Sequence, residues 1–256
     1  MSHDPNPKDS FFIGWAATPK RDRRFMLGAA LAAIGAGTTL SLLMAKQHEA
    51  VGKGQWDQAK SVTLSGYFIR DPWPLLLVTQ PDGTLETVLL VGNGKTAIFD
   101  RLPEPLPSFA QVTGTMIQRG AHRMLAVSDK KDWLIALSGG DNTDTVPINQ
   151  YKDEGSATLS GEILDAKCWF GAMRPGNGKV HKACAALCVR GGLPVAFCTN
   201  LCSDSSDIYL VLDPDGKPHG EDILPLVADL VYADGRIVSY GGFKQFRVAI
   251  GNIIRL

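Results

Sequence analysis

The feature that most constrains the fold is an internal repeat. The string Ser61–Gly66 (SVTLSG) returns as Ser156–Gly161 (SATLSG). Further on, Val88–Lys95 has a counterpart in Tyr209–Lys217. Each copy then closes with two runs that alternate apolar and polar residues, which is the pattern of half-buried β-strands. Similar strings in the same order indicate that one structural unit occurs twice.

Each unit reads as a small β-barrel. In the first copy, β-branched or apolar runs predict strands at 62–69, 75–79, 87–91, 112–118 and 124–127. Five short strands in so short a segment are typical of a Greek-key barrel of the OB type. We therefore predict a mostly β protein with OB-like five-stranded barrels at 61–138 and 156–256. The linker between them, 139–155, is rich in Asn, Thr and Asp.

Before the repeat, residues 25–45 carry no charge and are numerous enough to cross a membrane as a helix. Basic residues crowd the preceding flank at Lys20, Arg21, Arg23 and Arg24, whereas the flank that follows is mixed in charge. The positive-inside bias then keeps residues 1–24 in the cytoplasm and exports the chain from the linker 46–60 onward. We expect a single-pass protein of the bacterial inner membrane with periplasmic barrels.

Other interpretations of the apolar segment stay open. A cleaved signal peptide is one, although 42–45 lacks the small residue expected three positions before a cut. A buried core helix is another, but the basic flank argues against it. Arg23-Arg24-Phe25 also resembles a twin-arginine signal, which exports proteins already folded.

Composition excludes one class of partner and singles out one segment. Lys and Arg balance Asp and Glu, so the formal net charge is zero, and no basic stripe favours nucleic acid. All five cysteines lie between Cys168 and Cys202. In the second copy they fall in a predicted insertion, 165–205, that the first copy lacks.

The insertion carries a candidate metal site. Lys179–Arg190 reads as a short helix that ends at two glycines. On it, His181, Cys184 and Cys188 follow at i, i+3 and i+7 and share one face. Cys168, at the end of the preceding strand, completes a tetrahedral set for zinc, which also suits an iron–sulfur cluster or copper. Met173 is a further candidate ligand for copper, and Asp165 and Lys167 are candidates to orient the ligands.

Disulfides are the competing use of these cysteines, because an exported compartment is oxidising. Cys198 and Cys202 are the best candidates for a disulfide with or without a metal. Pairing Cys168 with Cys184 or Cys188 would leave one thiol over, since the count is odd. A third interpretation is that two of the cysteines form a redox-active thiol pair.

The same segment resembles a family of membrane-anchored, exported bacterial proteins with tandem OB-like domains. Its pattern is D-x-K-C-x-x-G-x-M-x-P-G-x-G-x-x-H-x-x-C-A-x-x-C-x-x-G-G-x-P, and every specified position is met from Asp165 to Pro194. Phe12-Ile-Gly-Trp15 also looks like that family. The resemblance implies topology and fold; it implies no activity, and Cys198 and Cys202 lie outside the shared pattern.

No motif points to an enzyme. The string Gly92–Thr96 mimics the end of a phosphate-binding loop, but the required earlier glycine is absent and Leu89 stands in its place. We expect a hairpin turn there. No nucleophile–base pair, paired carboxylates or dinucleotide fingerprint accompanies it.

Three functions follow from these patterns. The first is a metal- or cluster-binding accessory or electron-transfer subunit of an integral membrane redox or respiratory complex. The second is a metal or haem chaperone. The third is a non-catalytic interaction subunit braced by disulfides or structural zinc. We favour the first, on the site formed by Cys168, His181, Cys184 and Cys188.

Overall fold

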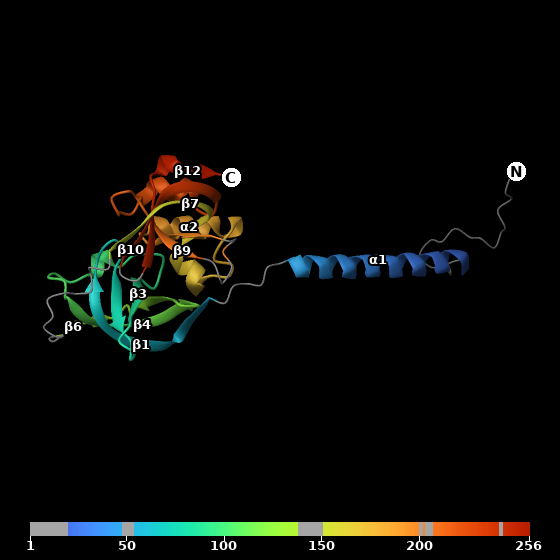
Figure 1. Ribbon diagram of the computed structural model, residues 1–256. Coiled ribbons are helices and arrows are strands. Elements are labelled where there is room, and N and C mark those ends of the chain that lie inside the picture. Colours follow the sequence, from blue (N-terminus) through green and yellow to red (C-terminus); the bar gives the residue numbers. More distant parts are fainter. Residues whose placement is uncertain (1–19, 48–53, 138–150, 200–201, 203–206, 241–242) are drawn as a thin grey trace. The chain divides into compact units, whose positions relative to one another are not determined.

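The computed structural model describes residues 20–47, 54–137, 151–199, 202, 207–240 and 243–256. They fall into two compact units, one ending at residue 50 and one beginning at residue 51 (Figure 1). In the first unit, helix α1 runs over Lys20–Gln47. Its stretch Asp22–Ala45 is long and apolar enough to cross a membrane, and its side chains are exposed. Near an N-terminus, membrane anchors and signal sequences share these properties.

The second unit contains two closed barrels. The first is built from β1 (Gln55–Ile69), β2 (Leu75–Thr79), β3 (Leu85–Val91), β4 (Phe109–Arg119) and β5 (His122–Val127). They pair in the order β1-β2-β3-β5-β4, and β4 returns to β1 and closes the sheet. Strands β3 and β5 are parallel, whereas the other barrel pairs are antiparallel. A short strand, β6 (Leu134–Ala136), extends the sheet along β4.

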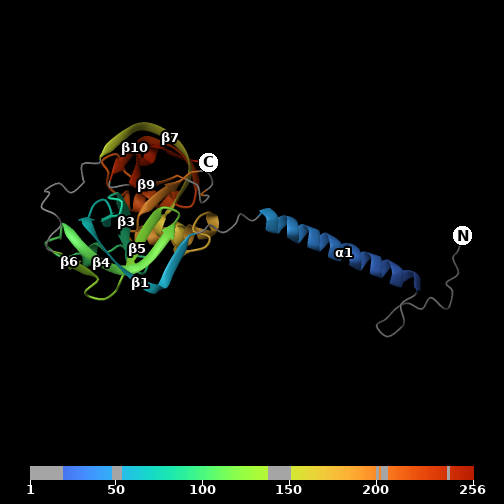
Figure 2. The same cartoon turned by 60° about the horizontal axis from the view of Figure 1, so that its bottom comes forward.

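The second barrel repeats this connectivity. Its strands are β7 (Lys152–Asp165), β8 (Val195–Cys198), β9 (Ile208–Leu212), β10 (Leu230–Tyr240) and β11 (Phe243–Arg247), with β12 (Ile253–Arg255) added along β10. The order β7-β8-β9-β11-β10 closes through β10 and β7, and β9 and β11 are parallel. Figure 2 shows the two groups of strands, blue to green and yellow to red. The prediction of two OB-like five-stranded barrels is confirmed.

The repeated string ends in glycine for a steric reason. A Cβ on Gly66 would lie 2.4 Å from the carbonyl oxygen of Leu77 on β2. A Cβ on Gly161 would lie 2.2 Å from the carbonyl oxygen of Cys198 on β8. Both distances are far below van der Waals contact, so only glycine lets the first strand of each barrel run this close to the second.

The connections differ between the barrels. In the first, β3 leads through residues 92–98 and a 3₁₀ turn, η1 (Phe99–Arg101), to β4. The expectation of a hairpin at Gly92–Thr96 is therefore wrong, since β3 pairs with β2 and β5 instead of with β4. In the second, η6 (Gly220–Leu226) takes the corresponding place, and η7 (Ile250–Asn252) precedes β12.

A long connection between β7 and β8 positions the candidate site. Strand β8 lies inside the range predicted as an insertion, so the inserted segment between the strands runs from residue 166 to 194. It comprises a π-helical turn, η3 (Cys168–Ala172), a 3₁₀ turn, η4 (Lys179–His181), and helix α2 (Lys182–Arg190). Most of the predicted linker, residues 139–150, lies outside the described residues.

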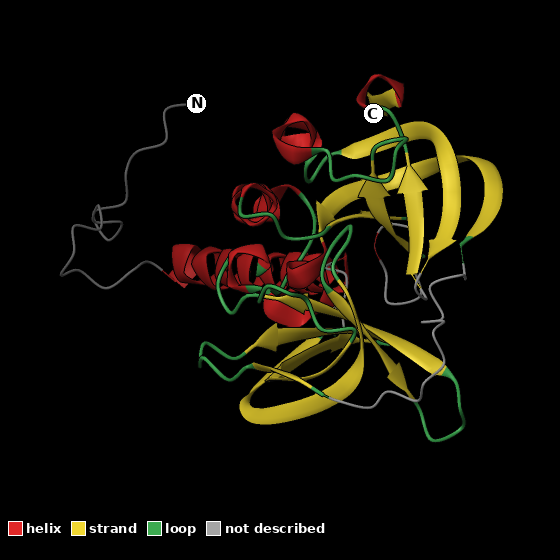
Figure 3. Ribbon diagram, turned by 90° about the vertical axis from the view of Figure 1, so that its left-hand side faces the viewer, coloured by secondary structure: helices red, strands yellow, loops and turns green. Residues whose placement is uncertain are grey.

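The inserted segment packs into a core shared by both barrels. Figure 3 shows the strands of the barrels, in yellow, as two separate groups. That core joins Trp73 and Leu89 of the first barrel to Trp169 and Cys188 of the insertion. Trp73 is 2% exposed, and its indole N–H donates to the carbonyl oxygen of Gly192 at 3.2 Å. Because apolar side chains of both barrels are buried together, this core holds the insertion against the first barrel.

Candidate metal centre

Cys168 is placed by the end of strand β7. The strand ends at Asp165, whose Oδ1 accepts a hydrogen bond from the backbone N–H of Cys168 at 2.8 Å. Asp165 is fully buried and Cys168 is 3% exposed. This side-chain-to-backbone bond starts the turn η3 and fixes the direction in which Cys168 leaves the strand.

Helix α2 supplies two more cysteines. Cys184 and Cys188 are one helical turn apart and share a face. The prediction of a helix over Lys179–Arg190 is confirmed, with its first turn wound as the 3₁₀ turn η4. Gly191 follows the last residue of the helix, and a Cβ on it would lie only 1.8 Å from the carbonyl oxygen of Lys95 in the first barrel. Glycine at this position is what lets the two segments meet.

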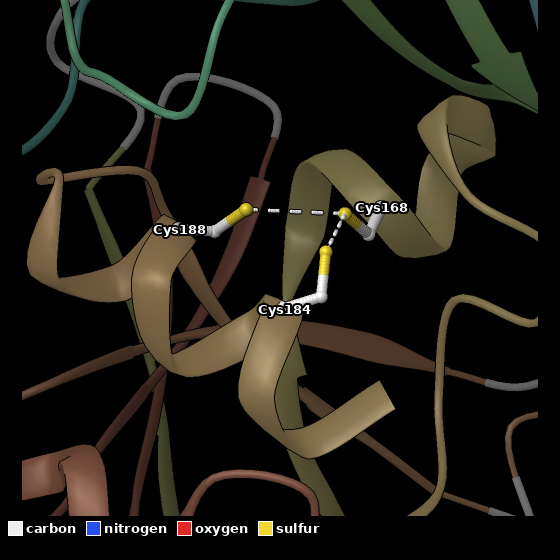
Figure 4. A group of neighbouring side chains, drawn as sticks. All are labelled: Cys168, Cys184 and Cys188. Atoms are coloured by element: carbon white, nitrogen blue, oxygen red, sulfur yellow. Dashed lines mark hydrogen bonds between the residues drawn. The ribbon is translucent and has the colours of Figure 1, made fainter. Parts of the chain in front are cut away.

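The three cysteines converge (Figure 4). Cys168 Sγ lies 4.0 Å from Cys184 Sγ and 3.9 Å from Cys188 Sγ, and all three sulfurs lie within 4.8 Å of one another. Cys168 and Cys188 are buried, and Cys184 is half-buried. A disulfide requires sulfurs about 2.05 Å apart. Around a zinc ion with bonds of about 2.3 Å, the sulfurs of a tetrahedron stand about 3.8 Å apart. The separations therefore suit one shared metal ion.

His181 belongs to a neighbouring group. Its Nε2 lies 3.0 Å from Asp165 Oδ2, and ligand atoms of Asp165, Cys168 and His181 lie within 4.8 Å of one another. Both His181 and Asp165 are buried. The two groups have Cys168 in common. The structure thus brings three of the four predicted ligands into one group and places His181 with Cys168 in the other.

A lysine from the first barrel completes the surroundings of the thiols. Lys95 Nζ donates to Cys184 Sγ at 2.7 Å and lies 3.8 Å from Cys188 Sγ. It comes from the connection after β3, which is tied to the insertion by a bond from Ala97 N–H to the carbonyl oxygen of Gly191 at 2.7 Å. An ammonium group beside thiolates offsets their negative charge and stabilises them.

A second lysine, Lys167, is hydrogen-bonded to the same connection. Lys167, which is 3% exposed, donates from its Nζ to the carbonyl oxygens of Gly92, Asn93 and Gly94 at 2.7, 2.8 and 2.7 Å. Its ammonium also lies 4.9 Å from the ring centroid of Trp56. Burial lowers the pKa of Lys167 to about 8, against the opposing effect of the nearby cysteines and Asp165. Three carbonyl acceptors satisfy all three of its N–H donors, so Lys167 fixes the connection that carries Lys95.

The pKa values of the Cys168 and Cys188 thiols shift in opposite directions. The hydrogen bond with Cys188, together with burial, raises the pKa of the Cys168 thiol. The hydrogen bond from Cys168 lowers the pKa of Cys188 in spite of burial, and nearby Lys95 adds to the effect. The hydrogen bond to Cys184 raises the pKa of Lys95. Without a metal, therefore, Cys168 holds its proton more firmly than Cys188 does, and Lys95 keeps its charge.

The remaining candidates lie around this cluster. Cys198 and Cys202 form a disulfide, with Cα atoms 5.2 Å apart. Met173 follows η3, is 43% exposed, and lies on a shallow surface cavity also lined by Trp56 and Arg174. No contact brings the Met173 thioether to the three sulfurs among the described residues, whereas its backbone N–H donates to the carbonyl oxygen of Cys168 at 3.4 Å.

The sequence patterns did not identify Lys95. The only signal was the glycine-flanked string Gly92–Thr96, which exposes its carbonyl groups to Lys167 and turns Lys95 toward the thiols. Comparisons with protein families, with curated proteins and with solved structures found no match for this chain.

Proposed function

We propose that this protein is a membrane-anchored, exported metal-binding accessory subunit of a redox complex in the bacterial inner membrane. The observation that carries the proposal is the convergence of Cys168, Cys184 and Cys188 to separations of 3.9 and 4.0 Å, beside a lysine. Soft thiolate ligands favour copper(I), zinc and iron.

The separations favour a mononuclear position at these three sulfurs over a cubane iron–sulfur cluster. In a cubane cluster each cysteine binds a different iron, so the cluster holds the cysteine sulfurs apart. Here the sulfurs surround a point that one ion would fill. A zinc ion would take a fourth ligand, and copper(I) would be satisfied by three thiolates. The fourth ligand predicted from the sequence, His181, lies in the neighbouring group instead, with Asp165 bonded to its ring.

The apolar helix and its basic flank support the proposed location of the protein. Helix α1 is apolar over the length of a bilayer core, and Arg23 and Arg24 belong to the basic flank at its N-terminal side. This orientation would leave both barrels in the periplasm. The disulfide between Cys198 and Cys202 fits an oxidising compartment. A site held on one anchored barrel would stay within reach of a membrane partner.

Metal delivery is a second candidate function. The observation that favours it is the half exposure of Cys184, while Cys168 and Cys188 are buried. A thiol that faces solvent allows an incoming ligand to attack the ion while the buried ligands still hold it. Rapid exchange of the ion with a competing chelator would favour delivery, whereas slow exchange with a reversible redox change would favour electron transfer.

The first experiment is elemental analysis with a thiol count on the full chain, produced in an exporting bacterial host and purified in detergent. We expect at least one equivalent of zinc, copper or iron, lost from Cys184→Ser and from Cys188→Ser. The matched control is the pair Cys198→Ser and Cys202→Ser, which removes two cysteines outside the cluster and should keep the metal. A metal-free protein in which the cluster cysteines are oxidised would refute the proposal and leave an interaction module braced by disulfides.

A further inference from the structure

We propose that Asp165, Cys168 and His181 form a second metal position, and that Cys168 bridges it to the three-cysteine site. The protein would then hold two ions in one dinuclear centre, with a thiolate shared between them. This inference rests on the proposed function, because the bridging sulfur belongs to the first site.

The three ligands of the second position are buried and lie close together. Asp165, Cys168 and His181 are 0%, 3% and 2% exposed, and each offers a ligand atom within 4.8 Å of the others. They combine an oxygen, a sulfur and a nitrogen, which is a donor set that zinc accepts. The backbone N–H of Cys168 donates to Asp165 Oδ1, and this hydrogen bond fixes the orientation of the carboxylate.

The contact between His181 and Asp165 has two possible interpretations. In the first it is a buried hydrogen bond that only braces the insertion. In the second, the two side chains are metal ligands that bond to each other while no ion is bound. Their N···O separation of 3.0 Å is close to the separation of about 3.3 Å between ligands around a tetrahedral zinc with bonds of about 2.0–2.1 Å. A small movement would therefore admit an ion.

The donor set favours the second interpretation. A brace between β7 and the insertion needs only the carboxylate and the imidazole, whereas the thiol of Cys168 also lies within reach of both. When loaded, the three thiolates and the Asp165 carboxylate carry four negative charges in a largely buried site. One divalent ion with the ammonium groups of Lys95 and Lys167 would balance these charges, so net charge admits one ion or two. A thiolate sulfur has the lone pairs to bind both ions.

The test is a titration of the full chain, in detergent and stripped of metal under reducing conditions, with Co²⁺. We expect two equivalents to bind. The first should give the strong thiolate-to-cobalt absorption of the three-cysteine site. The second should weaken the electron paramagnetic resonance signal per cobalt, because a bridging thiolate couples the two spins.

Variants separate this inference from the proposed function. His181→Ala should lower the stoichiometry from two to one and keep the thiolate absorption. Asp165→Asn keeps the shape of the side chain and should also lower the stoichiometry to one. This variant tests the second position even if His181→Ala does not fold. His219→Ala, in the second barrel and outside both groups, is the control and should still bind two.

Each other result is decisive. One equivalent in the wild type that survives His181→Ala would overturn the second position and leave the proposed function standing. One equivalent that His181→Ala abolishes, in a protein that circular dichroism shows to be folded, would make His181 the fourth ligand of a single ion and would also overturn it. No binding by the reduced wild type would overturn both proposals.

Discussion

At the scale of single residues, two lysines govern the surroundings of the site. Lys95 brings a positive charge to the thiols, and Lys167 holds the connection that carries Lys95. Lys167 is the more structural of the two, because its ammonium is buried and its bonds go to backbone carbonyls. Such a group stabilises the fold only while its partners remain in place.

Replacing Lys167 tests this role. We expect Lys167→Met to lower the free energy of unfolding by on the order of 3 kcal/mol, since the carbonyls of Gly92, Asn93 and Gly94 lose a charged donor. Thermal unfolding of the metal-free protein measures the loss. The control is Lys130→Met, an exposed lysine of the first barrel, which should change little. Equal effects of the two substitutions would contradict the assignment.

A second residue-scale prediction concerns acid. The Asp229 carboxylate is 2% exposed and accepts from Lys179 and from Lys182, the latter at 2.8 Å. Burial raises the pKa of Asp229, but the bonds from Lys179 and Lys182 outweigh it and bring the pKa to about 2. A lowered folded-state pKa gives stability that is present above the unfolded-state value of 3.8 and is lost as the pH falls through the folded-state value.

We therefore expect the wild type to lose about 1–2 kcal/mol of stability through Asp229 as the pH falls from about 4 to about 2. This range discounts the full shift because Lys179 is exposed to screening solvent. Asp229→Asn should be less stable at pH 6 and should show a flatter dependence over that window. Urea unfolding at a series of pH values measures both. Parallel curves for the two proteins would show that Asp229 does not titrate as stated.

At the scale of elements, the centre depends on contact between the insertion and the connection 92–97. Helix α2 ends against this connection at Gly191, where there is no room for a side chain. The bond from Ala97 N–H to Gly191 and the indole bond from Trp73 to Gly192 lie at the same junction. The thiols and their lysine therefore come from different barrels and meet only while this junction is intact.

Gly191→Ala tests the junction. The added Cβ would lie 1.8 Å from the Lys95 carbonyl oxygen, so one of the two segments must move. We expect a loss of stability of about 2 kcal/mol or more, together with weaker metal binding as Lys95 shifts. Gly251→Ala is the matched control, because nothing lies within 4 Å of its added Cβ. Unchanged melting temperature and metal affinity in Gly191→Ala would show that the junction yields freely.

At the scale of the whole molecule, the chain combines an apolar helix with a unit of two barrels. Each barrel closes on its own sheet, but one buried core contains side chains of both. The site therefore gains rigidity from two barrels although its thiols come from one. Under the proposed function, helix α1 would tether this unit to the membrane.

The topology can be tested directly. In spheroplasts, the proposed orientation predicts that added protease digests the barrels while residues 1–24 stay protected, because a basic flank favours the cytoplasmic side. Changing Lys20, Arg21, Arg23 and Arg24 to glutamate should reduce the digested fraction. The intact mass of the purified protein adds a second criterion. A mature chain that begins after residue 45 would show a cleaved signal peptide and refute the anchor.

The sequence alone was sufficient for the features that local pattern encodes. The repeated string and the alternation of apolar residues predicted two five-stranded barrels, and the charge-free run predicted the apolar helix. Spacing along one short helix predicted that Cys184 and Cys188 share a face, and Cys198 and Cys202 were the best candidates for a disulfide. These features depend on neighbours in the chain, so periodicity and composition carry them.

Only the tertiary structure decided what surrounds the thiols. Lys95 is 89 residues from Cys184, and Lys167 is 75 residues from Gly92. Contacts this distant follow from the docking of one barrel on the other, which no local pattern records. The same applies to His181, which helical spacing grouped with Cys184 and Cys188. The chain winds as a 3₁₀ turn at His181 and aims its ring at the buried end of β7, where Asp165 is the partner.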